Sequence, residues 1–277
     1  MLKSIALAAA VLASTVSIAH ADTTIARANN QVWLSIGGEH VNYSETDTTG
    51  ITGTGTLDSE KGTLPAIQLG VTKQFDAFNV HNLFVQASLT AARGHTNYDG
   101  YLEGFDSLGN FELVPFQNNT RSTTVDFGLK LGKSFAFGPG SRAQLTPYIS
   151  YGYHYWDRNM EGQYGYEEKY SHSVLGGGLL AQYALTDRLV TSIDANAGAT
   201  IGAKMKTGGF SDFGLGSKAQ EQLTLGADYA VTRKLHVNAS YSLTHFEYGQ
   251  SAMNNGYYEP DSRTTNQVFM VGLGYSF

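Results

Sequence analysis

The sequence predicts an all-β chain, folded as an antiparallel, up-and-down transmembrane β-barrel of ten strands. Three observations indicate this fold: long segments in which every second residue is apolar, connections that alternate between short and long, and the absence of cysteine and of long apolar runs after the N-terminus. Strands with one apolar face produce such an alternation, and a membrane barrel has short turns at one end and long loops at the other.

The first 21 residues predict a signal peptide. Lys3 precedes a short apolar run from Ile5 to Ile18, and Ala19-His20-Ala21 follows as a small-x-small cleavage site. The apolar run is shorter than the roughly 20 residues that a transmembrane helix needs. We therefore expect an exported protein whose mature part, residues 22–277, is a single barrel domain.

The composition excludes several functional classes. The 277 residues include 32 glycines and 17 tyrosines but no cysteine, so no disulfide, thiolate nucleophile or cysteine-ligated metal can form. The net charge of −6 argues against a nucleic-acid partner. The acidic loop residues lack the alternate spacing of a calcium-binding loop. We expect no metal and no cofactor.

Ten segments alternate in this way, and their length favours a membrane barrel. Strands of soluble proteins have about 5–6 residues, whereas a tilted strand that crosses a membrane needs roughly 9–11. The expected strands are 31–43, 61–73, 81–93, 120–135, 144–155, 169–185, 189–201, 217–231, 235–244 and 263–277.

The connections alternate in length along the chain. Short ones are expected near 75–80, 136–142, 186–188 and 232–234, and long ones near 44–60, 94–119, 159–168, 202–216 and 249–262. An even strand number then brings both termini to the same end. The number of membrane-crossing strands depends on the segment 101–116. If it is a hairpin that projects from a long loop, the barrel has ten strands. If it crosses the membrane twice, the barrel has twelve.

Two similar turns fix the register of their hairpins. In YALTDRLV and YAVTRKLH, three-residue loops place Leu185 opposite Leu189 and Val231 opposite Leu235, on the apolar face. The same register predicts that Asp228 lies opposite Asn238, with His236 diagonal to it.

The last segment, NQVFMVGLGYSF, places large apolar residues at alternate positions and small ones between them. We expect it to close the barrel against 31–43. With the signal peptide and the loop pattern, it resembles the Gram-negative outer-membrane β-barrel proteins. The size is similar to that of ten-stranded omptins, opacity-type surface proteins and twelve-stranded autotransporter domains. The resemblance implies an assembly signal, read by the barrel assembly machinery, at Phe269, Val271, Leu273, Tyr275 and Phe277.

No catalytic residues are predicted. Omptin proteases carry Asp-x-Asp and Asp-x-His pairs, and lipid A deacylase barrels carry His-x-Ser; this sequence contains none of them. In Ser171-His172-Ser173 the neighbouring side chains point to opposite faces of a strand.

Polar residues on the inner face predict a hydrogen-bonded network that fills a narrow lumen. Its expected members are Asp126, Lys130, Asp194, Asp228, His236 and Asn238. Asp126 and Lys130 lie roughly 13 Å apart along one strand, so direct contact between them is not required. A selective pore or a proton-linked site is the alternative interpretation.

An aromatic cluster and a glycine run complete the candidates. Tyr151, Tyr153, Tyr155 and Trp156, with Tyr164 and Tyr166, are interpreted as an aromatic girdle that continues into a loop, or as a ligand platform. The run 176–178 lies within a strand, so close packing against bulky neighbours is expected there.

These patterns predict a non-enzymatic surface protein or surface antigen of the cell outer membrane, with long extracellular loops and a largely side-chain-filled lumen. A porin-like channel for small solutes is the alternative, and an outer-membrane hydrolase is a further one. The expected partners are outer-membrane lipids, lipopolysaccharide, the assembly machinery and an extracellular ligand bound by the loops.

Overall fold

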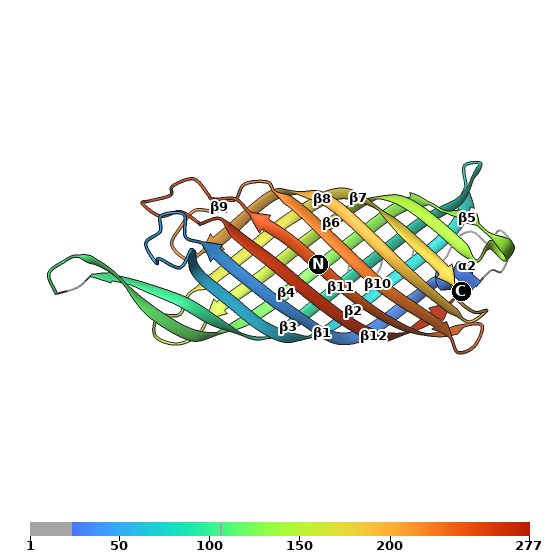
Figure 1. Cartoon of the computed structure of the whole chain (residues 1–277), viewed down its shortest axis with the longest axis horizontal. Helices are drawn as coiled ribbons and strands as arrows, with labels where there is room; N and C mark the ends of the chain where they lie inside the picture. The colour runs from blue at the N-terminus through green and yellow to red at the C-terminus, as the bar shows by residue number, and fades with distance from the viewer. Residues whose placement is uncertain (1–23, 106) are drawn as a thin grey trace.

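The computed structural model describes residues 24–105 and 107–277; the predicted signal peptide lies outside the described residues. Ten long antiparallel strands form a closed barrel (Figure 1). They are β1 (Gln31–Thr46), β2 (Thr56–Ala77), β3 (Val80–Phe105), β4 (Phe111–Lys133), β6 (Ala143–Met160), β7 (Glu167–Ala184), β8 (Leu189–Thr207), β10 (Ala219–Ala230), β11 (Leu235–Tyr248) and β12 (Ser262–Ser276).

The last strand closes the barrel against the first. β12 pairs with β1 along its length, from Gln31↔Ser276 to Glu45↔Ser262. Each other long strand pairs with its neighbours in chain order, including β8 with β10. The predicted ten strands and their closure are confirmed. Two short strands that were not predicted, β5 (Phe135–Phe137) and β9 (Phe213–Gly214), attach to β6 and β8.

The two ends of the barrel differ. One end, called here the terminal end, carries the short turns, the C-terminus, the 3-10 turn η1 (Pro139–Ser141) and the short helix α2 (Thr24–Ala28) (Figure 1). The other, called the loop end, carries the long connections. The register Asp228↔Asn238 and the pairing Ala184↔Val190 show that the predicted registers of both short hairpins are confirmed.

The segment 101–116 forms a hairpin that projects from the loop end. β3 and β4 stay paired as far as Phe105↔Phe111, well beyond the last pairs with their outer neighbours (Figure 1). The predicted projecting hairpin is therefore confirmed, and the twelve-strand alternative is wrong.

Side chains alternate between the outer surface and the lumen. On β12, Phe269 and Leu273 are 55% and 58% exposed, whereas Met270 between them is 1% exposed. The apolar core lies inside the barrel towards the loop end. It is formed by Val41, Tyr43, Leu64, Ala66, Ala92, Trp156, Tyr170, Ala203, Met205, Phe213, Leu215, Phe246, Tyr248 and Met270. Among the described residues, no helix is long and apolar enough to cross a membrane.

Candidate functional site: a polar lumen between two side-chain layers

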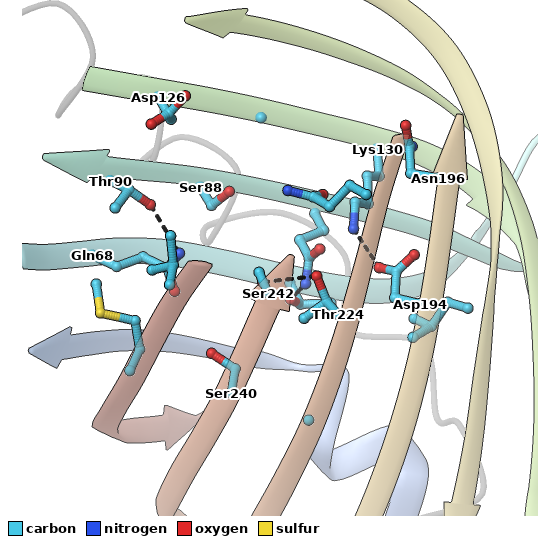
Figure 2. Close-up of a pocket in the computed structure, with 18 of the residues that line it drawn as sticks. Gln68, Ser88, Thr90, Asp126, Lys130, Asp194, Asn196, Thr224, Ser240 and Ser242 are labelled. Atoms are coloured by element: carbon cyan, nitrogen blue, oxygen red, sulfur yellow. Dashed lines mark hydrogen bonds and ion pairs between the residues drawn. The ribbon is translucent and has the colours of Figure 1, made fainter. Parts of the chain in front are cut away.

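The middle of the barrel encloses a cavity of about 340 Å³. Amide and hydroxyl side chains line it, among them Gln68, Ser88, Thr90, Thr224 and Ser242 (Figure 2). Five of the six polar residues predicted for the lumen also line it: Asp126, Lys130, Asp194, Asp228 and Asn238. The sixth, His236, is 1% exposed and lies beside Asp228.

Lys130 and Asp194 form an ion pair across the lumen, from β4 to β8 (Figure 2). The Tyr148 hydroxyl donates a hydrogen bond to the same carboxylate. Asn196 Nδ2 donates to Tyr148 Oη at 3.2 Å and to Ser150 Oγ at 2.8 Å. Each carboxylate oxygen of Asp194 therefore has a donor, which a charged group removed from bulk water requires.

A second group lies nearer the terminal end. His236 Nδ1 lies 2.6 Å from Asp228 Oδ1, and Gln31 Nε2 donates to Asp228 Oδ2 at 3.0 Å. Asn238 Nδ2 donates to Gln31 Oε1 at 3.3 Å. The predicted diagonal contact between Asp228 and His236 is thus present, and Gln31, which was not predicted, joins Asn238 to it.

The third group lies on the loop side of the cavity. Asp126 Oδ1 lies 2.7 Å from His154 Nδ1, so Asp126 and Lys130 engage different partners. Glu39 accepts hydrogen bonds from Thr124 at 2.5 Å and from Asn266 at 3.0 Å. The six predicted lumen residues, all of which the structure describes, are therefore divided among three polar groups.

At the terminal end, α2 and a layer of amides lie inside the barrel. Ile25 and Ala28 of α2 pack against Ala184 and Val190. Next to them the amide layer, defined as Asn29, Gln74, Gln144 and Gln182, is held by hydrogen bonds of 2.8–3.2 Å between its side chains. Its members are 3–9% exposed, so water reaches little of the layer.

At the loop end, stacked aromatic rings fill the lumen. Trp156 stacks on Tyr170 with ring centroids 5.4 Å apart, and Tyr170 stacks on Tyr248 at 5.7 Å. Tyr43 contacts the Trp156 ring edge-on at 5.1 Å. All four rings are at most 2% exposed.

Arg158 lies beside these rings and is 2% exposed. Its guanidinium contacts four carboxylates: Nε contacts Glu60, Nη2 lies 3.0 Å from Asp58, and Nη1 lies 2.8 Å from Glu168 and 3.6 Å from Glu45. One buried cation thus holds acidic groups from β1, β2 and β7 together. Because desolvation of these charges is costly, the cluster depends on the arginine for compensation.

The loop 249–261 is fastened to this cluster by Glu259. The Tyr170 hydroxyl donates to Glu259 Oε1 at 2.6 Å, and the backbone N–H of Glu259 donates to Ser251 Oγ at 2.8 Å. Burial, together with the neighbouring Glu168 carboxylate, raises the pKa of Glu259 to about 8. Glu259 therefore holds a proton over much of the neutral range while the loop is in place.

No protein-family model and no curated protein matches the sequence. Among solved structures, the chain is similar to the outer membrane protease OmpT of Escherichia coli, with a TM-score of 0.56 and 11% identity over 96% of this chain and 100% of OmpT. The chain has the fold of the Gram-negative outer-membrane β-barrel proteins.

Two further barrels are similar at lower scores. The transport unit of the Escherichia coli autotransporter AIDA-I has a TM-score of 0.45 at 15% identity, over 99% of this chain and 98% of that one. The outer membrane protein OprG of Pseudomonas aeruginosa has a TM-score of 0.41 at 13% identity, over 90% and 96%.

The barrel places the residues of its predicted assembly signal on the outer surface. Phe269, Val271, Leu273, Tyr275 and Phe277 are 41–58% exposed. The Phe277 N–H donates to the Asn30 carbonyl at 3.1 Å, next to the start of β1. The assembly role of these residues stays a prediction.

In the run Ser171-His172-Ser173, the imidazole of His172 contacts neither serine; it contacts a tyrosine and a glutamine. His172 Nδ1 lies 2.8 Å from Tyr248 Oη and Nε2 lies 3.0 Å from Gln220 Oε1. Among residues 24–105 and 107–277, no group of three or more His, Asp or Glu side chains could hold a metal ion.

The interpretation of Trp156 as part of the outer girdle is wrong. Tyr151 and Tyr153 are exposed on the outer face, but Trp156 points into the lumen and donates to Ser122 Oγ at 2.7 Å. Adjacent strand residues face opposite sides, so Trp156 cannot share a face with Tyr153 and Tyr155. The same alternation places Arg158 inside, a signal that the sequence contained.

Proposed function

We propose that the chain is a non-enzymatic integral protein of the cell outer membrane, exported by a cleaved signal peptide, whose external loops make its contacts and whose lumen is closed. One observation supports this most directly: specific side-chain layers fill the lumen at both ends. The amide layer and α2 close the terminal end, and the aromatic rings with Arg158 close the loop end. A small barrel whose interior is filled in this way is a scaffold for its loops.

Conductance of the purified, refolded protein in planar bilayers tests this proposal. We expect no stable open current from the wild type. The loop-end variant Arg158→Ala/Tyr170→Ala and the terminal-end variant Ile25→Ser/Asn29→Ala each leave one layer intact, so both should stay closed. The combined variant should conduct, because the cavity then connects to both ends.

A stable open current from the wild type would contradict the proposal. So would a single-ended variant that conducts as well as the combined one, because one of the layers would then not seal the lumen. Circular dichroism and resistance to unfolding in SDS show whether each variant retains the barrel.

The polar cavity supports a porin-like channel as the second candidate. A volume of about 340 Å³ lined by amides, hydroxyls and carboxylates can hold water or a small polar solute. Transport through it requires both ends to open: the loop 249–261 and the aromatic rings at one end, and α2 and the amide layer at the other. Solute uptake into liposomes, with the same four proteins, separates this candidate from the closed scaffold.

A further inference from the structure

The β3–β4 hairpin continues past the barrel as a two-stranded ribbon. The last pair of β3 with β2 is Asp99↔Ser59, and the last pair of β4 with β6 is Thr120↔Met160. From Thr120 to Phe111 the ribbon extends for roughly 30 Å at the usual rise per residue. Among the described residues, no strand pairs with its outer edges beyond those points (Figure 1).

One face of the ribbon is used within the molecule. Phe116 packs against Tyr98 at 6.2 Å and against Tyr164 of the β6–β7 loop at 6.1 Å. Asn118 Nδ2 donates to the Glu161 carbonyl at 2.5 Å. These contacts fix the base of the ribbon to the barrel and leave the opposite face open.

The opposite face is apolar although it lies outside the barrel. By strand alternation its positions are those of Tyr101, Phe105, Phe111, Leu113 and Pro115, which are apolar or aromatic, and position 103, which is a glutamate. Phe105 is 76% exposed and Phe111 is 48% exposed, with their rings 6.1 Å apart. Exposed apolar groups of this size, gathered on one face, mark an interaction surface.

The charged side chains of residues 94–119 are all acidic. Residues 94–119 contain four acidic side chains, Asp99, Glu103, Asp106 and Glu112, and no lysine or arginine. Arg121, which follows the segment on β4, is already paired with Glu161 at 3.1 Å. A partner for the ribbon must therefore supply positive charge as well as apolar surface.

Backbone geometry distinguishes the two edges. Pro115 has no N–H. A proline in a sheet places its nitrogen on the unpaired side of its strand, so the outer edge of β4 has no hydrogen-bond donor at Pro115. The pair Tyr101↔Pro115 is then a non-hydrogen-bonded pair, and the backbone N–H of Glu103, two residues on, faces the open edge of β3. An unpaired edge of this kind can bind an additional strand.

We propose that the β3 edge Leu102–Phe105 binds an extended, cationic segment of a partner protein by strand addition, with apolar side chains of that segment on Phe105 and Phe111. This inference rests on the proposed function and names the partner of one external element. Main-chain hydrogen bonds to β3 supply affinity, and the acidic side chains select the sign of the charge.

Fluorescence anisotropy with synthetic octapeptides tests it. The probe alternates lysine and valine, and the controls alternate glutamate and valine or carry a central proline in the lysine–valine sequence. We expect the refolded protein to bind the probe at least about tenfold more tightly than either control, which corresponds to about 1.4 kcal/mol. Added salt should weaken the binding of the probe.

Three variants locate the site. Replacing 101–115 by Asn-Gly, a favoured two-residue turn, should abolish binding. Glu103→Pro removes a charge and the edge donor, whereas the matched Glu103→Gln removes the charge alone, so the proline variant should bind more weakly than the glutamine variant.

Equal binding by the shortened variant would overturn the proposal, and so would equal binding of the glutamate peptide. Sedimentation velocity tests whether the edge binds a second copy instead: the wild type would then self-associate and the shortened variant would not. Purified lipopolysaccharide tests whether the edge binds lipid: the wild type would then bind it and the shortened variant would not. The shortened variant should still show no conductance. An open current in the wild type would contradict the closed scaffold while leaving the peptide result to be judged separately.

Discussion

Single residues at the loop end determine how the barrel is closed. Arg158 is the cation of the buried cluster, and Glu259 connects that cluster to the loop 249–261 through Tyr170. Both act in surroundings with little water, where an unpaired charge is far more costly than at the surface. Replacing either residue should therefore change stability or loop docking more than replacing an exposed residue of the same charge.

Arg158→Gln should lower the free energy of unfolding by about 3–5 kcal/mol, because the buried carboxylates lose their counter-ion. The matched control is Arg121→Gln, which breaks the exposed pair with Glu161 and should cost less than about 1 kcal/mol. Urea unfolding of both variants in lipid vesicles measures the difference. Equal losses would show that the cluster does not depend on Arg158.

The attachment of the loop 249–261 should weaken as the pH rises. Because burial raises the pKa of Glu259 to about 8, the docked loop binds a proton that the free loop gives up near its ordinary pKa. Docking is therefore strongest below the ordinary glutamate pKa and is lost progressively as the pH rises towards 8.

A nitroxide on Ala252→Cys reports this change, since Ala252 is exposed and the chain has no other cysteine. Its mobility should rise between about pH 5 and pH 8. In the background Glu259→Gln the mobility should not depend on pH, because the amide cannot ionise. A pH response that survives in Glu259→Gln would assign the titration to another group.

At the scale of elements, glycines allow bulky lumen side chains to fit between the strands. A Cβ at Gly178 of β7 would lie 2.4 Å from Tyr148 Oη and 2.3 Å from the Ala195 carbonyl oxygen. The expected close packing in the run 176–178 is therefore present, and it positions the tyrosine that contacts Asp194.

Gly178→Ala should destabilise the barrel by about 1–3 kcal/mol, because the Tyr148 side chain and the Ala195 backbone must both shift to make room. Gly208→Ala is the control, since a Cβ there has no atom within 4 Å. Urea midpoints of the two variants, compared with the wild type, provide the measurement. A neutral Gly178→Ala would mean that Tyr148 relocates without cost.

At the scale of the whole molecule, the closing strand β12 pairs with β1 and also carries the predicted assembly signal. If the terminal aromatic is an assembly signal, deletion of Phe277 should reduce the amount of folded barrel in cells more than it reduces refolding in detergent. Heat-dependent gel migration of both preparations measures the two yields. Equal losses would assign Phe277 to packing alone.

Most of the fold could be predicted because period-2 alternation and turn length are local properties. They fix each strand, each short hairpin and the contact of Asp228 with His236. The partners across the lumen could not be predicted, because they depend on the strand tilt and shear of the closed barrel. Lys130 and Asp194 lie on β4 and β8, and Arg158 reaches acids on β1 and β2. The sequence predicts that these side chains face the lumen, but it does not predict which side chain each of them meets there.

The pairing of β12 with β1 has a consequence for the order of the chain itself. Ser276 lies opposite Gln31, and Phe277 is hydrogen-bonded to Asn30, so a short linker could join the C-terminus to α2. A chain permuted in this way and opened within the loop 249–261 would keep all of its strand pairings. The strand that ends in Phe277 would then lie inside the polypeptide, and the new termini would lie at the opposite end of the barrel. Such a circular permutant would keep the strand pairings that fold the barrel but would lose the terminal position of the predicted assembly signal.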